Sequence, residues 1–217
     1  MDRVRVGKSP GKTLLWVWLR RDLKSITSGV GIDAACGFMH NRKFFCVDDY
    51  VGFDLDESRV KEGLRRHADV TGFTCSIVDA PTTLGELKGD VVVCVQTLNT
   101  NIRFDSEELI PSIERLIDIT KPGGTLLLNI GSKGDPIEAT TPEVARTLAR
   151  RFSAVEIKRY GFLHKSNGLV SRMLPDRLRV LINLTWAYVM DLVPPLRTAF
   201  GFRWRKVYVR ADGRYGA

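Results

Sequence analysis

Short apolar runs alternate with amphipathic segments along most of the chain. The runs of a strand's length stand at residues 29–33, 50–56, 72–80, 90–98, 125–131 and 153–162. Segments with apolar residues at spacings of three and four stand at 57–68, 105–120 and 141–152. Such spacing is typical of a helix with one buried face. The alternation predicts an α/β protein with a doubly wound, mostly parallel sheet and right-handed crossovers, to which the alternating residues 204–212 add a seventh strand.

Two segments lie outside this alternation. Residues 12–26, in an N-terminal extension that spans 1–27, read as a helix before the first strand. Its Trp16 and Trp18 cannot share one helical face, so part of this helix is expected to serve as a lid or an interface. The second segment, 165–203, is a helical insertion between the last two strands, and the whole chain, 1–217, is predicted to be a single domain.

The insertion contains a long helical pattern with marked ends. Pro175 stands near its start, and Pro194 and Pro195 stand at its end. The pattern is rich in apolar residues and has arginines on both sides. Three interpretations stay open: a helix that covers the active site, an amphipathic helix on an anionic membrane surface, and a contact between two copies in a homodimer.

Composition narrows the class of protein. The chain has 217 residues with 44% hydrophobic content, which predicts a packed core. No run approaches the ~18 apolar residues of a spanning helix. The apolar run at 13–19 has no cleavage site after it, so we expect a cytoplasmic protein, with attachment to the inner face of a membrane as the alternative. The four cysteines form no C-x-x-C pair, so reduced thiols and no metal site are expected.

The positive charge is concentrated in the C-terminal third. The net charge is +8, yet residues 150–217 hold 14 Lys and Arg against 4 Asp and Glu, which leaves a net charge of −2 for the rest of the chain. Such asymmetry favours an anionic partner: a membrane surface, a nucleic acid or a phosphorylated substrate. A solvated basic face without a partner is the alternative.

Polar or small residues follow the predicted strands at the edge where open parallel sheets bind ligands. The first strand ends at Asp33 and is followed by small residues up to Gly37. Small residues let the backbone approach a ligand closely. The second strand ends near Asp54, an acid suited to accept hydrogen bonds from two vicinal ribose hydroxyls. The pattern therefore predicts a ligand that carries a nucleoside.

Two such ligands compete. A dinucleotide fold needs G-x-G-x-x-G so that a pyrophosphate can lie on a helix N-terminus. Here Phe38, Met39 and His40 stand where further glycines would fall, and a pyrophosphate would be crowded. S-adenosylmethionine has no phosphate and needs less glycine.

Five motifs together resemble those of class I S-adenosylmethionine-dependent methyltransferases. They are, in order, GIDAACG, YVGFDLDES, VDA, VVVCVQTLNT and ITKPGGTLLLNIG, between about residues 29 and 131. The usual first motif is D-x-G-C-G-x-G, and here Ala35 and Met39 replace two of its glycines. The resemblance implies a Rossmann-like methyltransferase fold, S-adenosylmethionine as cofactor and methyl transfer as the activity.

The resemblance also implies roles for the first two motifs. Gly37 and its neighbours Ala35 and Cys36 would line the methionine part of the cofactor. Asp33 belongs to the same set, and the alternative is that it only braces the loop. Asp54 would hold the ribose hydroxyls, with Leu55 beside it in the cofactor-binding set.

The later motifs would complete the cofactor site. Asp79 and Ala80 would lie beside the adenine, although Asp79 could instead cap a helix. Gln96 and Thr97 would stand near the methyl group, with a purely structural role of Gln96 as the alternative.

Methyl transfer is an in-line attack on a sulfonium methyl with a good leaving group, so the protein mainly supplies proximity and alignment. A hydroxyl nucleophile also benefits from a base. His40 and His164 are the candidate bases, and many enzymes of this class need none.

The acceptor is the open question. A looser resemblance to bacterial methyltransferases encoded with polysaccharide and glycolipid assembly enzymes suggests O-methylation of a small-molecule, glycan or lipid-linked acceptor. A nucleic acid is less favoured, because QTLN follows the fourth strand where base-amino methyltransferases carry N/D-P-P-Y/F/W. The alternatives are an RNA-directed methyltransferase that uses the basic C-terminal third and a non-catalytic partner protein with a cofactor fold.

Overall fold

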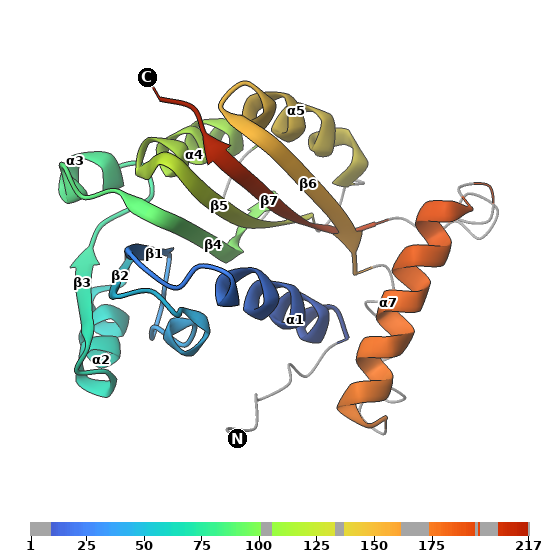
Figure 1. Ribbon diagram of the computed structural model, residues 1–217, viewed down its shortest axis with the longest axis horizontal. Coiled ribbons are helices and arrows are strands. Elements are labelled where there is room, and N and C mark those ends of the chain that lie inside the picture. Colours follow the sequence, from blue (N-terminus) through green and yellow to red (C-terminus); the bar gives the residue numbers. More distant parts are fainter. Residues whose placement is uncertain are drawn as a thin grey trace.

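The computed structural model describes residues 10–100, 106–132, 137–161, 174–193, 195 and 204–216 (Figure 1). Its elements follow one another as α1 (Pro10–Lys24), β1 (Val30–Ala34), the 3-10 turn η1 (Arg42–Phe44), β2 (Asp49–Asp54), α2 (Glu57–Arg66), β3 (Val70–Thr74), α3 (Ala80–Leu84), β4 (Gly89–Thr100), α4 (Ser106–Asp118), β5 (Thr120–Ser132), α5 (Ile137–Ala149), β6 (Phe152–Tyr160), α7 (Asp176–Leu192) and β7 (Lys206–Arg214).

The strands form one seven-stranded sheet in the order β3-β2-β1-β4-β5-β7-β6. The pairs β2–β3, β1–β2, β1–β4 and β4–β5 are parallel, whereas β7 runs antiparallel to both β5 and β6. The predicted seven-stranded, mostly parallel, doubly wound sheet is confirmed. The order of the strands reverses between β1 and β4, which is the point where such sheets bind ligands.

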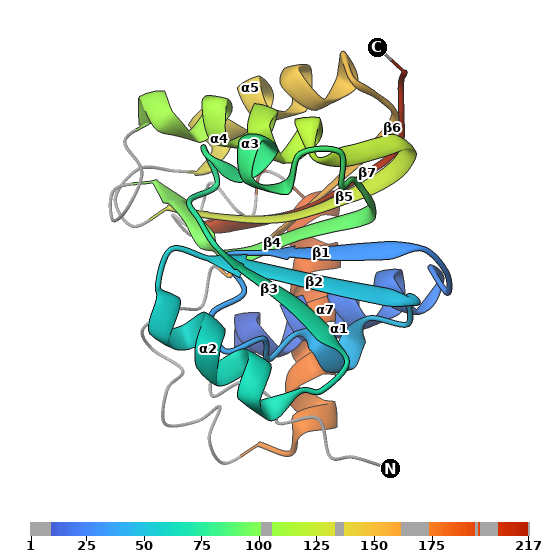
Figure 2. The same cartoon turned by 90° about the vertical axis from the view of Figure 1, so that its left-hand side faces the viewer.

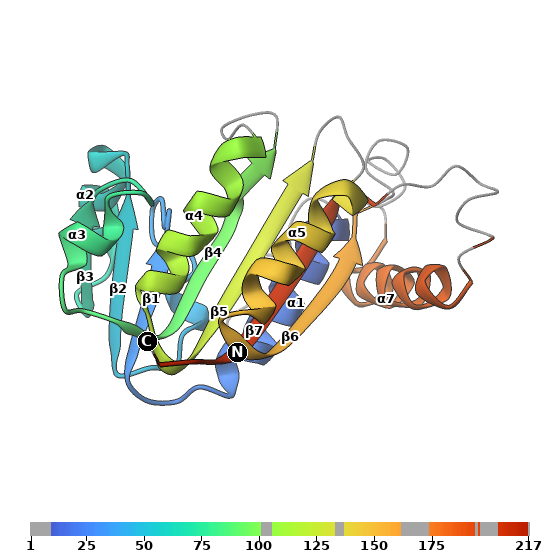
Figure 3. The ribbon, with the colours of Figure 1, turned by 90° about the horizontal axis from the view of Figure 1, so that it is seen from above.

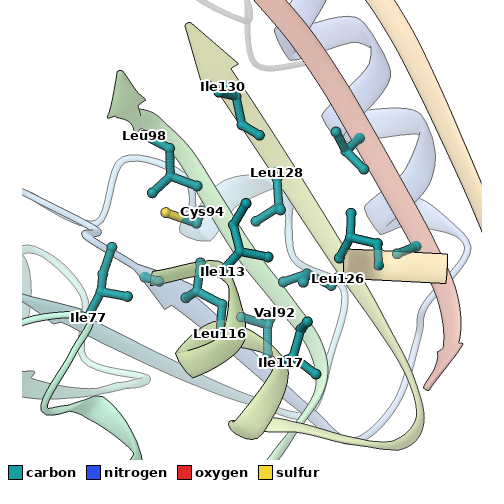
Figure 4. Packing of buried hydrophobic residues seen from close by; sticks show 14 of the residues in the cluster. Ile77, Val92, Cys94, Leu98, Ile113, Leu116, Ile117, Leu126, Leu128 and Ile130 are labelled. Atoms are coloured by element: carbon teal, nitrogen blue, oxygen red, sulfur yellow. The ribbon is translucent and has the colours of Figure 1, made fainter. Parts of the chain in front are cut away.

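Helices cover both faces of the sheet. Figure 2 shows α3, α4 and α5 on one face and α1 and α2 on the other. The middle strands supply both layers of the core because successive side chains point to opposite faces. Val92 and Cys94 of β4 pack in the cluster that includes Ile113 of α4 (Figure 4). Val91 and Val93 pack in the other cluster, which includes residues of α1. Burial on both faces explains the continuous apolar run of this central strand.

The third strand is shorter than the sequence predicts. The apolar pattern indicates a strand at 72–80, but β3 ends at Thr74 and α3 begins at Ala80. The Ser76 hydroxyl donates a hydrogen bond to the Asp79 carboxylate at 2.6 Å and accepts one from the Asp79 N–H at 3.1 Å. These bonds close a turn, and Pro81 then lies in the first turn of α3, where a missing N–H costs nothing. The expected strand end at Asp79 and Ala80 is therefore wrong.

Helix α1 lies in the expected N-terminal segment and begins slightly earlier, at Pro10. Its two tryptophans diverge as predicted. Trp18 is buried and meets Tyr160 of β6 edge-on at 5.4 Å, whereas the half-buried Trp16 stacks on Phe44 at 5.3 Å. Asp22 ties the end of α1 to the sheet by accepting a hydrogen bond from the Tyr208 hydroxyl at 2.9 Å.

Helix α7 lies between β6 and β7 in the sequence and stands beside the β6 edge of the sheet (Figure 3). Pro175 is its N-cap residue, as expected, and the helix ends at Leu192. It packs against α1 and β6. The remaining parts of the predicted insertion, 165–173, 194 and 196–203, lie outside the described residues. Among the described helices, none has the length and apolarity to cross a membrane.

Candidate functional site

A cavity of about 890 Å³ opens where β1, β2 and β4 end. It is lined by Lys12, Trp16, Ala35, Cys36, Gly37, Phe38, His40, Asn41, Phe53, Asp54, Leu55, Arg59, Cys75, Ser76, Ile77, Val95, Gln96 and Thr97. Its position is the reversal of strand order between β1 and β4, as expected for a ligand site in an open parallel sheet.

The loop after β1 has an unusual backbone. Ala35, Gly37 and Met39 have φ angles of 54°, 53° and 56°, in the left-handed region that glycine adopts most easily. Ala35 and Met39 are the two positions at which the resembling motif has glycine. The loop therefore keeps the conformation that glycines would favour, even though two of them are absent. A Cβ on Gly37 would meet no atom within 4 Å, so its backbone borders open space.

Asp54, at the end of β2, holds this loop. One carboxylate oxygen accepts a hydrogen bond from the Gly37 N–H at 2.8 Å, and the other accepts one from the Asp56 N–H at 3.0 Å. A carboxylate has about four acceptor sites, so both oxygens keep capacity for a ligand. Leu55 beside it lines the cavity with a side chain that is 75% exposed.

Asp33 is fully buried and is not among the cavity-lining residues. Its carboxylate accepts hydrogen bonds from the Tyr50 hydroxyl at 2.7 Å and from the Asn41 amide at 3.1 Å. Burial is the main cause that raises the pKa of Asp33 to about 7, against the opposing effect of these two donors. Asp33 thus braces the loop from behind, which was the alternative interpretation of this residue.

The expected adenine neighbours lie elsewhere. Asp79 is exposed and engaged with Ser76, and Ala80 is fully buried. Neither lines the cavity. Cys75, Ser76 and Ile77 line the cavity instead, because β3 ends before the motif that was expected to contact adenine.

Gln96 and Thr97 line the cavity from a distorted part of β4. The pairing of β4 with β5 shifts register between Cys94 and Leu98, and Gln96 has a φ of 65°. Asn129 of β5 accepts a hydrogen bond from the Gln96 N–H at 3.3 Å and donates one to the Val207 carbonyl of β7 at 3.2 Å. Bulges of this kind re-aim side chains next to active sites.

Of the two candidate bases, only His40 can be placed, since His164 lies outside the described residues. His40 is exposed and lines the cavity. Burial of part of the ring, followed by the charges of Arg66, Lys43, His67 and Lys12, lowers the pKa of His40 below its ordinary value of 6.5. The ring is therefore neutral at pH 7 and can accept a proton.

Several lining residues were missed by the sequence reasoning. Lys12 and Trp16 come from α1, whose tryptophans were the one sequence signal for a lid. Arg59 comes from α2 and lies over the Phe38 ring at 5.8 Å. Nothing in the local pattern marks Arg59 as different from the other arginines of α2. Within the described ranges, no group of three or more His, Cys, Asp or Glu residues could hold a metal ion.

Comparison with solved structures shows what this fold resembles. Three similar chains are N-methyltransferase NodS from Bradyrhizobium japonicum in complex with S-adenosyl-L-homocysteine (12% identity, TM-score 0.60, 98% of this chain and 92% of that one), a SAM-dependent methyltransferase from Geobacter sulfurreducens in complex with S-adenosyl-L-homocysteine (14%, 0.53, 96% and 94%) and an rRNA methylase from Streptococcus thermophilus (12%, 0.52, 97% and 99%). No protein-family model and no curated protein sequence matches the chain. The chain therefore has the class I S-adenosylmethionine-dependent methyltransferase fold that the motifs predicted.

Proposed function

We propose that the protein is a methyltransferase that binds S-adenosylmethionine in the cavity at the ends of β1, β2 and β4. The observation that carries the proposal is Asp54, which holds the Gly37 N–H and borders the cavity with acceptor capacity left over. The cavity volume of about 890 Å³ lies within the roughly 300–1,000 Å³ of ligand pockets. The left-handed turn at Ala35, Gly37 and Met39 supports the same assignment.

The lining fits the parts of this cofactor. Asp54 would accept hydrogen bonds from the two ribose hydroxyls. Ser76 and Ile77, rather than Asp79 and Ala80, would lie against the adenine. Ala35, Cys36 and Gly37 would border the methionine part, and Gln96 and Thr97 the methyl group.

The cofactor supplies an electrophilic methyl on a sulfonium with a neutral leaving group. The protein's own contribution is to hold an acceptor in line with that methyl and to exclude water, which in favourable cases is worth about 7–11 kcal/mol. Neutral His40 at the cavity wall would take the proton of a hydroxyl acceptor. The bulge at Gln96, held by Asn129, would fix the polar wall beside the reacting atoms.

For the acceptor we favour O-methylation of a small-molecule, glycan or lipid-linked hydroxyl. The support is the rim of the cavity, where Lys12 and Arg59 are lining residues and Arg66 lies over the Phe38 ring. Such a rim suits an anionic acceptor. An RNA acceptor is the second candidate, because one similar fold is that of an rRNA methylase.

Calorimetric titration with S-adenosylmethionine, S-adenosylhomocysteine and NAD tests the cofactor. We expect both sulfur nucleosides to bind and NAD not to bind. The variant Asp54→Ala should lose at least tenfold in affinity, whereas Asp79→Ala should bind normally. Equal affinity of Asp54→Ala and the wild type, with both folded by circular dichroism, would refute the assignment.

Activity needs a separate experiment. The protein is incubated with methyl-labelled cofactor and a cell extract, which is then fractionated into small-molecule, lipid, glycan, RNA and protein pools. Label in the lipid, glycan or small-molecule pool supports the favoured acceptor, and label in RNA supports the second. Tight cofactor binding without label in any pool would favour the non-catalytic partner protein.

A further inference from the structure

A second cavity, of about 320 Å³, lies between α1 and α7. Its walls come from Thr13, Trp16, Val17 and Arg20 of α1 and from Arg177 and Val180 of α7. Trp16 also lines the cofactor cavity, so the two cavities adjoin at this one side chain. No part of the cofactor assignment uses the second cavity.

The Trp16 ring is held in place between the two cavities. It stacks on Phe44 with ring centroids 5.3 Å apart, and the Lys12 ammonium lies 5.7 Å from its centre. A ligand in the second cavity would therefore contact a fixed ring that also borders the first cavity. An acceptor whose body lies in the second cavity would have to extend past this ring into the first cavity, because its nucleophile and the methyl group must meet within a few ångströms.

The lining combines an apolar body with two cations. Val17, Val180 and the Trp16 ring give apolar walls. Arg20 and Arg177 are both exposed and, within the part of the chain that the structure describes, neither makes an ion pair or a hydrogen bond. The one acid of the lining, Asp176, is paired with Arg179 and does not neutralise them.

Charge and polarity thus point to one kind of occupant. Apolar walls favour a hydrocarbon or ring body, since its burial removes apolar surface from water. Two guanidinium groups in one lining favour a carboxylate or phosphate, which arginine can bind through two parallel N–H groups. A neutral or cationic amphiphile would leave these charges unmatched.

We propose that the cavity between α1 and α7 is the acceptor subsite and that it binds a single amphiphilic molecule with an apolar body and an anionic group held by Arg20 and Arg177. The role of this cavity as an acceptor site rests on the proposed function. Its binding of an anionic amphiphile rests on the second cavity alone. The exposed side chains of Leu181, Tyr188 and Leu192 on the same helix make an anionic bilayer the competing occupant, which the test below separates.

The probes are decanoate, n-decanol and decyltrimethylammonium, each titrated by calorimetry below its aggregation concentration with S-adenosylhomocysteine present. We expect decanoate to bind at least tenfold more tightly than the other two. The double variant Arg20→Gln/Arg177→Gln should lose at least tenfold in decanoate affinity and keep its affinity for S-adenosylhomocysteine within twofold. The variant Val180→Trp, which fills the cavity, should weaken the binding of decanoate in the same way.

Lys24→Gln is the matched control, because it removes an exposed cation of α1 that does not line the cavity. It should bind decanoate like the wild type. An equal loss of decanoate affinity in this variant would mean that the overall positive charge, and not the cavity, attracts the anion, and would overturn the proposal. The last measurement is sedimentation of the protein with vesicles of phosphatidylglycerol. Sedimentation with vesicles that depends on Arg20 and Arg177, without binding of decanoate, would overturn the pocket in favour of a bilayer.

The two proposals can fail separately. If S-adenosylhomocysteine binds and decanoate does not, the acceptor subsite is wrong and the cofactor assignment stands. If decanoate binds as expected and S-adenosylhomocysteine does not, the anion-binding pocket stands and the cofactor assignment fails.

Discussion

The Met39 side chain occupies the space in front of Gly63: its Sδ lies 2.9 Å from where a Cβ on Gly63 would be. The same side chain would also meet a Cβ on Gly52 of β2 or Gly72 of β3, at 3.2 and 2.9 Å from its Cε. Met39 is fully buried. A residue of the loop after β1 is thus packed into a hollow made by three glycines, and this packing ties the loop to β2, α2 and β3.

Gly63→Ala should therefore destabilise the protein. In an open helix this change stabilises by about 1 kcal/mol. Here the new methyl would lie 2.8 Å from the Met39 Cγ, and overpacking of this kind costs about 1–3 kcal/mol. The measurement is urea unfolding of Gly63→Ala, Met39→Ala and the double variant. The double variant should be less destabilised than the sum of the two, and a Gly63→Ala protein more stable than the wild type would contradict the packing.

Ala35→Gly should leave the protein as stable as the wild type or more stable, by about 1 kcal/mol at most. The left-handed φ of 54° destabilises a residue that has a Cβ by about 1–2 kcal/mol, and glycine is free of this strain. Glycine also makes the unfolded chain more flexible, which offsets part of the gain in stability. The neighbouring Ala34→Gly is the control, since Ala34 is a buried strand residue and should lose stability. Thermal melts compare the pair, and a similar loss in both would argue against strain at position 35.

Stability should depend on pH through Asp33. Its pKa is raised to about 7 in the folded protein, so between pH 4 and 7 the folded state binds more protons than the unfolded state. The free energy of unfolding then falls as pH rises through this window. Asp33→Asn cannot ionise, so its stability relative to the wild type should improve from pH 4 to pH 8, by up to about 4 kcal/mol. Asp49→Asn, at an exposed position, is the control, and its dependence of stability on pH should stay close to that of the wild type. Parallel curves of stability against pH for Asp33→Asn and the wild type would refute a neutral Asp33.

His40 should set the acidic limb of the pH–rate profile if it is the base. Because its pKa is lowered below 6.5, methyl transfer should rise with pH to a midpoint below 6.5 and then level off. His40→Ala should lose about 10²-fold or more in kcat and lose this limb while keeping cofactor affinity. Arg66→Gln removes a charge that lowers the pKa, so its midpoint should move to higher pH. An unmoved limb in His40→Ala would exclude the histidine as base.

Asp22 should be critical for anchoring α1, and with it Lys12 and Trp16 at the cavity. The carboxylate is 1% exposed and lies 3.2 Å from a guanidinium nitrogen of Arg210 and 2.9 Å from the Tyr208 hydroxyl. Asp22→Ala leaves the buried Tyr208 hydroxyl without its acceptor and removes one of the two acids beside Arg210, which keeps Asp212 at 2.7 Å. The change should cost about 1–3 kcal/mol in chemical unfolding. Arg21→Ala removes only a half-exposed partner and should cost less than about 1 kcal/mol. Similar losses in the two variants would mean that the buried partners do not hold the helix.

Periodicity was enough to predict most of the fold. The alternation of strands and helices, the helix after Pro175 and the divergence of Trp16 from Trp18 all follow from local spacing, and the structure has each of them. Local spacing was not enough at the end of β3. There an apolar pattern continued past Thr74, while the Ser76–Asp79 hydrogen bonds had already turned the chain.

The sequence likewise predicted one part of the candidate site and missed another. Ala35, Gly37, Asp54 and Gln96 were predicted to gather, because parallel strands bring their carboxyl ends to one edge, and all four line the cavity. Asp33 carries the same signal as Asp54, yet it faces buried donors instead of the cavity. The alternation of side chains along a strand does not tell which of two acids at strand ends meets a ligand.

The sequence by itself determined the order of strands and helices and the edge of the sheet at which the cavity lies, since these depend on the character of neighbouring residues. Only the tertiary structure decided that Met39 would take up the space of three distant glycines, that Ser76 would replace Asp79 at the cavity, and that α1 and α7 would enclose a second one. Those outcomes depend on which surfaces meet after folding, and packing between remote segments leaves no periodic trace in the chain.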